Sequence, residues 1–495
     1  MRFDFLLTIQ RGDSNMRKRF EQQLSIGTIP IGEVVIKLKG RDRIKSMLAA
    51  LQEIFINPEY NEKIFSILED RIVKGKKKTG RPGMDLWQIF VLAQFRLCLN
   101  ISYDRLEYMA DNDSLLRRIM GIEKGFGYEP IEVEYQSIID NVTLLDDVTI
   151  RELNEVIVKL GHDIFKKKEG VALRLKTDSF VVESNVHFPT DYNLLWDCAR
   201  KCLDAVSAFL VKYPDLPEWR KIRNWKNELK GLMRSLGQAN ASGGKNKERR
   251  VLESTRKYLN KAIALSEKIA TSKKSLPIFD EADMAKFISL EHFETLLIKH
   301  MDLVERRLIK GETIPHEEKM FSIFEEYTEW ITKGKLHPNV ELGKKTAITT
   351  DQYGLIVDYR VMENEADSEI VLPLASKLLK DYIIESWSFD KGFFHKENKL
   401  QLKKQVAKLI MPKKGKRNQE EEVEENERGF IRLRHGHSAI ESNINELEHR
   451  GLDRCPDRGY GHFKRYIGLA VGAYNLTRIG KKLFEEKREV QKRAA

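Results

Sequence analysis

The sequence predicts an α/β protein with a mixed sheet flanked by helices, an N-terminal helical domain and a large helical insertion. Three observations support this fold class. Short runs rich in Val, Ile, Leu and Phe, typical of strands, occur within 171–188 and again within 344–413. Apolar residues recur at helical spacing across roughly 40–125. Residues 214–335 are heavily charged and helical in pattern, without the strand pattern of the segments on either side.

Length and composition limit the class of protein. With 495 residues the chain is too long for one ordinary domain. Its 86 Lys and Arg residues against 75 Asp and Glu residues give a net charge of +11, which favours a polyanionic partner. A hydrophobic content of 41% predicts packed cores. No apolar stretch approaches the ~18 residues of a membrane span, and no cleavage site follows the short N-terminal apolar patch, so we expect a cytoplasmic protein without a membrane partner.

The N-terminal region is expected to be helical. Its apolar periodicity predicts helices over 41–56, 60–75, 84–100, 102–110 and 113–121. Ser102 and Asp113 stand where N-caps are expected, and Gly121 follows the last of these helices. The basic joint 74–84, punctuated by Gly and Pro, cannot be helical throughout. The last three helices fit a helix-turn-helix-like bundle, and an ordinary helical bundle fits them equally well.

The first strand signals come after this region. The segment 171–188 predicts two strands around a turn near Asp178. A helix is expected over 193–213. From 214 onward the pattern is helical, with breaks at 239–249 and 272–283.

Strand signals return in the last third of the chain. The segment 344–362 predicts a hairpin closed near Gln352–Gly354. A helix over 370–382, strands over 385–390 and 406–413, a flexible loop over 413–429 and two final helices complete the pattern. Without the insertion, the element order describes a mixed sheet flanked by helices.

Three carboxylates stand out against this pattern. Asp178 and Asp390 follow short apolar runs at predicted strand ends, and Glu441 lies in a predicted helix. Two aspartates on strands and a glutamate on a nearby helix can form an all-oxygen site for two Mg²⁺ ions. Asp351 also follows a short strand and is a rival for the first aspartate, although "TDQYG" is typical of a hairpin turn.

Four phrases around these residues carry a resemblance. They are Thr177-Asp178-Ser179 with "VVESNVHFPTD", "FDKGF" at Asp390, "AIESNINELEHRGLDRCPDRG" with "AYNLTRIG" at Glu441, and the N-terminal "GRPGMDLWQIFVLAQFRLCLN". In their order along the chain, with the N-terminal phrase first, they resemble bacterial insertion-sequence transposases with an RNase H-like DDE domain. The resemblance covers the chain except for the first forty residues and approximately 214–335.

The resemblance implies a nucleoid-associated bacterial enzyme that cleaves the ends of its own mobile element and joins them to target DNA. It implies that Asp178 bridges two Mg²⁺ ions while Asp390 and Glu441 each hold one, and that Mn²⁺ can substitute. It further implies a homodimer or higher homo-oligomer on the terminal repeats. Two alternatives stay open, a two-metal nuclease without strand transfer and a non-catalytic DNA-binding relic.

On this basis the chain divides into four parts. Residues 1–125 form a helical DNA-binding or dimerisation domain, and 126–213 form a linker with the first part of the catalytic domain. Residues 214–335 form the helical insertion, and 336–495 form the second part of the catalytic domain with the C-terminal helix.

The glutamate region departs from the family pattern Tyr-x2-Arg-x3-Glu-x6-Lys. With Glu441 as the glutamate, Arg434 replaces the Tyr, His437 replaces the Arg and Glu448 replaces the Lys. We therefore expect Arg434 and His437 to contact phosphate. Glu446 and Glu448 are rivals of Glu441, which is preferred because it shares a helix face with His437.

Further DNA contacts are expected from cations. Lys76, Lys77, Lys78 and Arg81 lie in the basic joint, where an extended Arg-Pro segment can enter a narrow minor groove and a solvated linker is the alternative. Lys391, beside Asp390, is a further candidate phosphate contact.

The insertion also carries cations on one predicted helix, which suit terminal DNA or a partner subunit: Arg220, Lys221, Arg223, Lys226, Lys230 and Arg234.

Overall fold

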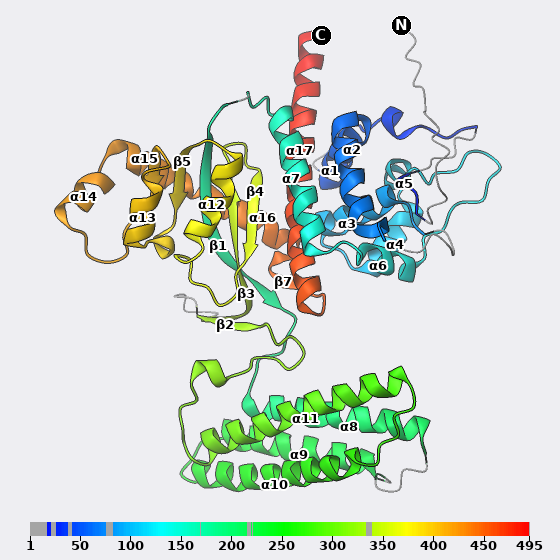
Figure 1. Ribbon diagram of the computed structural model, residues 1–495, viewed down its shortest axis with the longest axis vertical. Helices are drawn as coiled ribbons and strands as arrows, with labels where there is room; N and C mark the ends of the chain where they lie inside the picture. The colour runs from blue at the N-terminus through cyan, green and yellow to red at the C-terminus, as the bar shows by residue number, and fades with distance from the viewer. Residues whose placement is uncertain are drawn as a thin grey trace. The chain divides into compact units, whose positions relative to one another are not determined.

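The computed structural model describes residues 17–20, 26–37, 42–75, 83–168, 170–214, 219, 221–332 and 339–494 (Figure 1). Contacts between residues divide the chain into two compact units. The first combines Met1–Ser184 with Gly343–Ala495, and the second is Asn185–Leu342. The architecture is mixed α/β, as predicted. No helix in the described ranges is long and apolar enough to cross a membrane.

The N-terminal part of the first unit is helical, as the apolar spacing predicts. It contains the 3-10 turn Ile31–Glu33, α1 (Arg43–Ile56), α2 (Pro58–Leu68), the π-helical turn Glu69–Val73, α3 (Leu86–Leu99), α4 (Tyr103–Asn112) and α5 (Ser114–Met120). The predicted caps are confirmed. Ser102 accepts a hydrogen bond from the backbone N–H of Arg105, and Asp113 caps α5 in the same way. Gly121 ends α5 with a φ of 69°.

One long helix connects this helical part to the sheet. α17 (Tyr460–Ala494) packs against α1 and α3, and also against α7 (Asp147–Ile164) and strand β4 (Ile356–Val361). From Tyr466 to Tyr474, α17 is apolar and buried on all sides, and Phe463 and Leu476 on either side of this stretch are also buried. A helix without a polar face needs neighbours all round. The predicted boundary at residue 125 therefore lies inside one compact unit.

The sheet is mixed and is centred on β1. Its strands are β1 (Leu173–Ser184), β2 (Glu329–Thr332), β3 (Val340–Thr350), β4, β5 (Ile384–Phe389), β6 (Lys408–Ile410) and β7 (Arg454–Cys455). β1 pairs antiparallel with β3, which pairs antiparallel with β4 as the predicted hairpin. On its other side β1 pairs parallel with β5, and β5 pairs parallel with β6. β2 pairs with β3, and β7 pairs with the end of β1.

The prediction of two strands around a turn near Asp178 is wrong, because β1 continues through this point. Its pairing with β3 is unbroken from Lys176 to Glu183. The segment has no Gly or Pro to interrupt a strand. The buried hydroxyl of Thr177 lies 2.8 Å from the Oγ1 of Thr349, so this polar group has a hydrogen-bond partner within the sheet.

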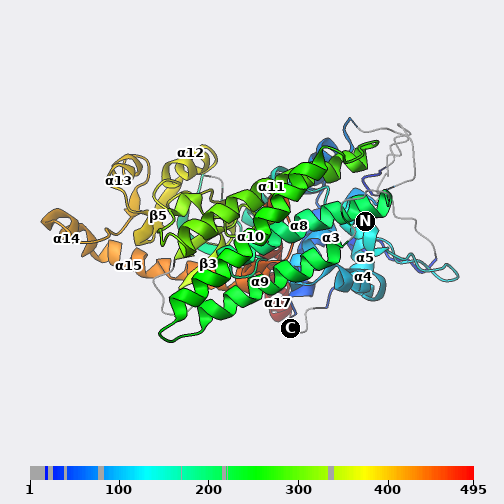
Figure 2. The same ribbon diagram turned by 90° about the horizontal axis from the view of Figure 1, so that it is seen from below.

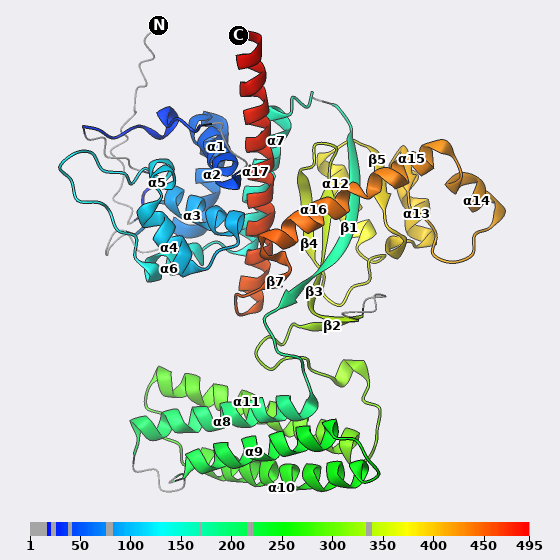
Figure 3. The same ribbon diagram turned by 180° about the vertical axis from the view of Figure 1, so that it is seen from behind.

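Helices cover both faces of the sheet. On one face, α12 (Val371–Asp381) packs over Leu175 and Trp387. On the other face lie α15 (Arg428–His437) and α16 (Ala439–Leu447), which approach β5 and β1. Figure 1 shows α12 in front of the sheet, and the view from behind in Figure 3 shows α16 in front.

The remaining described helices of the first unit are short. They are α6 (Tyr135–Val142), the 3-10 turn η5 (Lys391–Phe393), α13 (Lys396–Leu402), α14 (Gln419–Glu425) and the π-helical turn η6 (Glu448–Leu452). The predicted flexible loop over 413–429 is wrong, since α14 lies within it. A capping box of Asn418 and Glu421 begins this helix, and Glu421 also accepts hydrogen bonds from Lys413.

The second unit contains the helical insertion. Its helices are α8 (Asp191–Lys212), α9 (Ile222–Ala241), α10 (Lys247–Lys273) and α11 (Glu281–Leu308), followed by a 3-10 turn at His316–Glu318 (Figure 2). The sequence boundaries placed 193–213 with the sheet, but the buried face of α8, with Cys202 and Leu203, shares a core with Leu297 of α11. All four cysteines are buried, and none forms a disulfide.

Gly480 permits the closest approach of α17 to α1, because a Cβ at this position would overlap the carbonyl oxygen of Ser46. Gly480→Ala should lower the midpoint of thermal unfolding, since overpacking costs about 1–3 kcal/mol. Gly231→Ala in α9 is the matched control, because its Cβ would meet no atom within 4 Å. Alanine favours a helix interior by about 1 kcal/mol, so this variant should unfold no earlier than wild type. Equal midpoints for both variants would contradict the close packing.

Candidate active site

The structure brings Asp178 and Asp390 together. Asp178 lies in β1, and Asp390 is the first residue after β5. The two strands are parallel neighbours, and Thr177 pairs with Phe389. Asp178 follows Thr177 and Asp390 follows Phe389, so the two aspartates are also neighbours. Because side chains alternate along a strand, both carboxylates lie on the same face. This is the face opposite the apolar side chains of Leu175 and Trp387.

Glu441 lies above the same face. It is in the first turn of α16, and this helix packs against β1 (Figure 3). The charge of Glu441 acts on Asp178 and on His437, which places it within the same local environment. The three sequence-predicted carboxylates thus lie near one another.

The environment raises the pKa of Asp178 to about 6. Burial is the largest cause, because it removes the charged form from water. A hydrogen bond from the backbone N–H of Ser179, 2.7 Å long, opposes this effect. The negative charges of Asp390, Asp367 and Glu441 raise the pKa further. Asp178 is therefore a carboxylate whose charge the surrounding protein does not fully compensate.

Asp367 is a fourth carboxylate that sequence reasoning missed. It follows β4 and accepts hydrogen bonds from the Oγ of Ser179 at 2.7 Å and from the Nζ of Lys345 at 2.8 Å. A Cβ on Gly392 would lie 3.0 Å from its Oδ2. It belongs to the acidic run "ENEADSE", in which no local pattern distinguishes one acid from the next. Only the fold shows that this one lies beside Asp178.

His437 also reaches the site, from the last turn of α15. Its Nδ1 lies 3.0 Å from the Oγ of Ser388, two residues before Asp390. Its Nε2 is buried and has no hydrogen-bond partner in the described part of the chain. Burial lowers the pKa of His437, the charges of Asp390 and Glu441 oppose this shift, and Lys176 adds to it.

Of the other predicted DNA contacts, Lys391 and Arg434 lie within the described residues and the cations of the basic joint do not. Lys391 is exposed in η5, directly after Asp390. Arg434 is exposed on α15, one turn before His437. Both therefore border the site and can approach a phosphate. The cations of the basic joint, Lys76, Lys77, Lys78 and Arg81, lie outside the described residues.

Two of the three rival carboxylates, Asp351 and Glu446, have structural partners. Asp351 is buried, its Oδ2 lies 2.8 Å from the Nε2 of His162, and its Oδ1 accepts hydrogen bonds from the backbone of the hairpin turn. It is the residue after β3 and is held by His162 of α7. Glu446 accepts a hydrogen bond from Arg450 at 2.9 Å. These contacts favour Asp178 and Glu441.

The donor set fits Mg²⁺ in chemistry, although the side chains do not converge. Within the described ranges, no three Asp, Glu, His or Cys side chains meet at metal-ligand spacing. Carboxylate oxygens are nevertheless the ligands that Mg²⁺ prefers, and a cation would relieve the like charges around Asp178. Asp390 and Glu441 are exposed and can turn toward Asp178. A bound metal therefore requires a change in the orientation of these two side chains.

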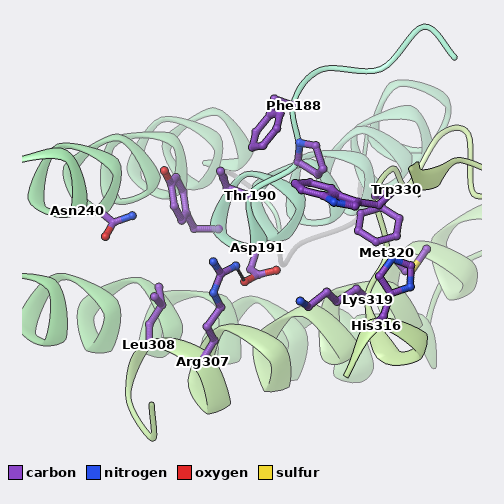
Figure 4. A pocket seen from close by; sticks show the side chains of 13 residues that line it. Phe188, Thr190, Asp191, Asn240, Arg307, Leu308, His316, Lys319, Met320 and Trp330 are labelled. Carbon is purple, nitrogen blue, oxygen red and sulfur yellow. Dashed lines mark hydrogen bonds and ion pairs between the residues drawn. The ribbon is translucent and has the colours of Figure 1, made fainter. Parts of the chain in front are cut away.

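A cavity of about 450 Å³ lies within the second unit (Figure 4). Trp330 forms part of its wall, with ring centroids 5.5 Å from Phe188 and 5.6 Å from Phe321. Its acid Asp191 is bound to Arg307 at 2.6 Å. Since this pocket has no second carboxylate among its lining residues, it lacks the pair that the expected chemistry needs.

The comparisons with known proteins give no family for this chain. No protein-family model matches it, and neither the curated proteins nor the solved structures include a similar one.

The raised pKa of Asp178 has a consequence for stability. In the unfolded chain an aspartate titrates near 4, so folding favours the protonated form between that value and about 6. The stability that protonation contributes is complete below pH ~4 and is lost as the pH rises through about 6. Asp178→Asn should therefore be more stable than wild type at pH 7.5 by about 3 kcal/mol, measured as unfolding at a higher denaturant concentration. At pH 4 the two proteins should unfold together. A constant difference at both pH values would contradict the shift.

Proposed function

We propose that this protein is a DNA transposase of the insertion-sequence type, with an RNase H-like DDE domain. It cleaves the ends of its own mobile element and joins them to target DNA. The observation that carries the proposal is the juxtaposition of Asp178 and Asp390 on parallel neighbouring strands, beneath the helix that holds Glu441. The mixed sheet, in which β1 has an antiparallel neighbour on one side and a parallel one on the other, also supports it.

The chemistry follows from the residues that face the site. Asp178, Asp390 and Glu441 would hold two Mg²⁺ ions, which when bound activate an oxygen nucleophile and stabilise the leaving oxygen of a phosphodiester. Mn²⁺ has similar ligand preferences and can replace them. Lys391 and Arg434 border the carboxylates and can orient the DNA phosphate.

Binding of DNA completes the proposal. The basic joint with Lys76, Lys77, Lys78 and Arg81 contributes phosphate and minor-groove contacts to the terminal repeats. Two or more copies of the chain act together on these ends, because cleavage and joining involve both ends of an element. The enzyme acts on the bacterial nucleoid.

One assay separates this function from its alternatives. The purified protein is mixed with Mg²⁺ and with the DNA that flanks its own gene, and cleaved ends and joined products are measured. Cleavage without joining would favour a two-metal nuclease. Binding without cleavage would favour a non-catalytic relic, a class that the grouping of all three acids disfavours.

Replacing any of the three carboxylates by its amide should stop the chemistry. Asp178→Asn, Asp390→Asn and Glu441→Gln should each lower the cleavage rate by at least ~100-fold, since even partners of metal ligands contribute 10–100-fold. Binding of terminal DNA without metal should stay within a few-fold of wild type. Both quantities are measured by single-turnover cleavage and by titration in EDTA.

Glu448→Gln is the matched control for Glu441→Gln, because it makes the same chemical change at the residue that directly follows α16. It should cleave at the wild-type rate. Loss of cleavage in Glu448→Gln together with normal cleavage in Glu441→Gln would transfer the third ligand to Glu448.

The effects of replacing Arg434 and His437 of α15 on the cleavage rate should depend differently on pH. Arg434→Ala should lower cleavage about tenfold or more at every pH, because a guanidinium stays charged and a hydrogen bond to a charged group contributes about 1.5–3 kcal/mol. His437→Ala should lower cleavage only at acidic pH, since burial lowers the pKa of His437 below its ordinary value near 6.5. Cleavage rates are compared from pH 5 to 8.5. Wild-type rates in both variants would make them surface residues.

A further inference from the structure

The charge of the second unit is concentrated in one helical hairpin. Residues 221–261, which form α9, the turn and most of α10, contain twelve basic and three acidic residues, a net charge of +9. The other residues of Asn185–Leu342 contain fifteen basic and twenty acidic residues, a net charge of −5. The excess of positive charge in the second unit therefore lies in this hairpin, while the rest of the unit has a net negative charge.

Few of these cations are used within the protein. Lys226 pairs with Asp204, Lys261 pairs with Glu228, and Arg249 pairs with Glu253. The following cations are exposed and make no salt bridge to a described residue: Lys221, Arg223, Lys230, Arg234, Lys245, Lys247, Arg256 and Lys257. Since like charges on adjacent turns repel one another, this arrangement suits an external polyanion better than it suits the folded chain.

The spacing of the cations forms a continuous basic face. Lys230 and Arg234 are one turn apart on α9, and Arg223 is two turns before Lys230, so all three project from one side of the helix. α10 packs against α9 and carries the exposed Arg256 and Lys257 (Figure 2). The only acid of α9 is Glu228, whose carboxylate is held by Lys261.

Gly231 leaves open space next to Lys230. Gly231 lies in the interior of α9, beside Lys230, where glycine is less favourable than alanine by about 1 kcal/mol. A Cβ there would meet nothing within 4 Å, so packing within the protein does not require glycine.

We propose that the basic face of the α9–α10 hairpin binds the phosphate backbone of duplex DNA without reading its sequence. The identity of the polyanion as DNA rests on the proposed function. The charge, its exposure and the open glycine belong to the hairpin itself. Lysine and arginine contacts to phosphate give affinity and a strong dependence on salt, but no base preference.

The test uses the full-length protein and a duplex of random sequence, in EDTA so that no cleavage occurs. The variant changes Lys230, Arg234, Arg256 and Lys257 to Gln. The matched control changes Lys274, Lys286, Lys299 and Lys310 to Gln, which removes the same charge from the rest of the second unit. Dissociation constants are measured from low to high salt, and circular dichroism verifies folding.

The hairpin variant should bind about tenfold or more weakly, and its slope of log affinity against log salt should be smaller by about 0.9 for each lost contact. The control should bind like wild type. Wild-type affinity and slope in the hairpin variant, or equal losses in both proteins, would overturn the proposal. If the four changes unfold the unit, the double variant Arg256→Gln with Lys257→Gln applies the same criterion with half the charge lost.

The test of DNA binding by the hairpin does not depend on whether the protein cleaves DNA. A wild-type protein that binds DNA through the hairpin but never cleaves would refute the transposase and leave this surface intact. A protein that cleaves normally but binds equally well without the four cations would keep the transposase and refute the surface.

Discussion

The hydroxyl of Thr177 connects the three central strands of the sheet. The indole N–H of Trp387 donates to it at 2.8 Å from β5, and the hydroxyl of Thr349 lies 2.8 Å away on β3. All three side chains are buried, so each bond is protected from water. They fix the register of β1 against both neighbours, and a slip of one residue would turn Asp178 to the opposite face. The position of both aspartates therefore depends on this buried network one residue away.

The carboxylates that this register brings together destabilise the fold. Burial and three neighbouring carboxylates make the charge of Asp178 unfavourable, which a purely structural position would avoid. The protein offsets part of this through the backbone N–H of Ser179 and through Lys345, which binds Asp367. Such uncompensated charge is typical of sites that await a cation or a substrate.

Much of this could be predicted from the sequence, for identifiable reasons. The hairpin of β3 and β4, the caps at Ser102 and Asp113 and the strand before Asp390 all depend on local patterns, and the structure has them. The absence of Gly and Pro from 171–188 favours a continuous β1, but the partners of Thr177 could not be predicted, because they lie far along the chain.

The role of Asp367 and the place of α8 were missed for a similar reason. Nothing near Asp367 in sequence distinguishes it from other acids, and α8 has a helical pattern that fits either unit. Tertiary contacts decide both. The metal geometry and the DNA contacts stay predictions, since side-chain orientation at a charged site depends on its ligand.

The way the second unit is inserted explains why the sheet tolerates it. Glu183, at the end of β1, pairs with Gly343, where the chain returns in β3. The two ends of the insertion are therefore neighbouring residues of an antiparallel ladder, and a whole bundle can replace a short hairpin turn without altering the pairing. Gly343 makes this possible, because a Cβ there would overlap the carbonyl oxygen of Val182. The same ladder continues to Asp178, so the insertion is joined directly to the strands that position the carboxylates.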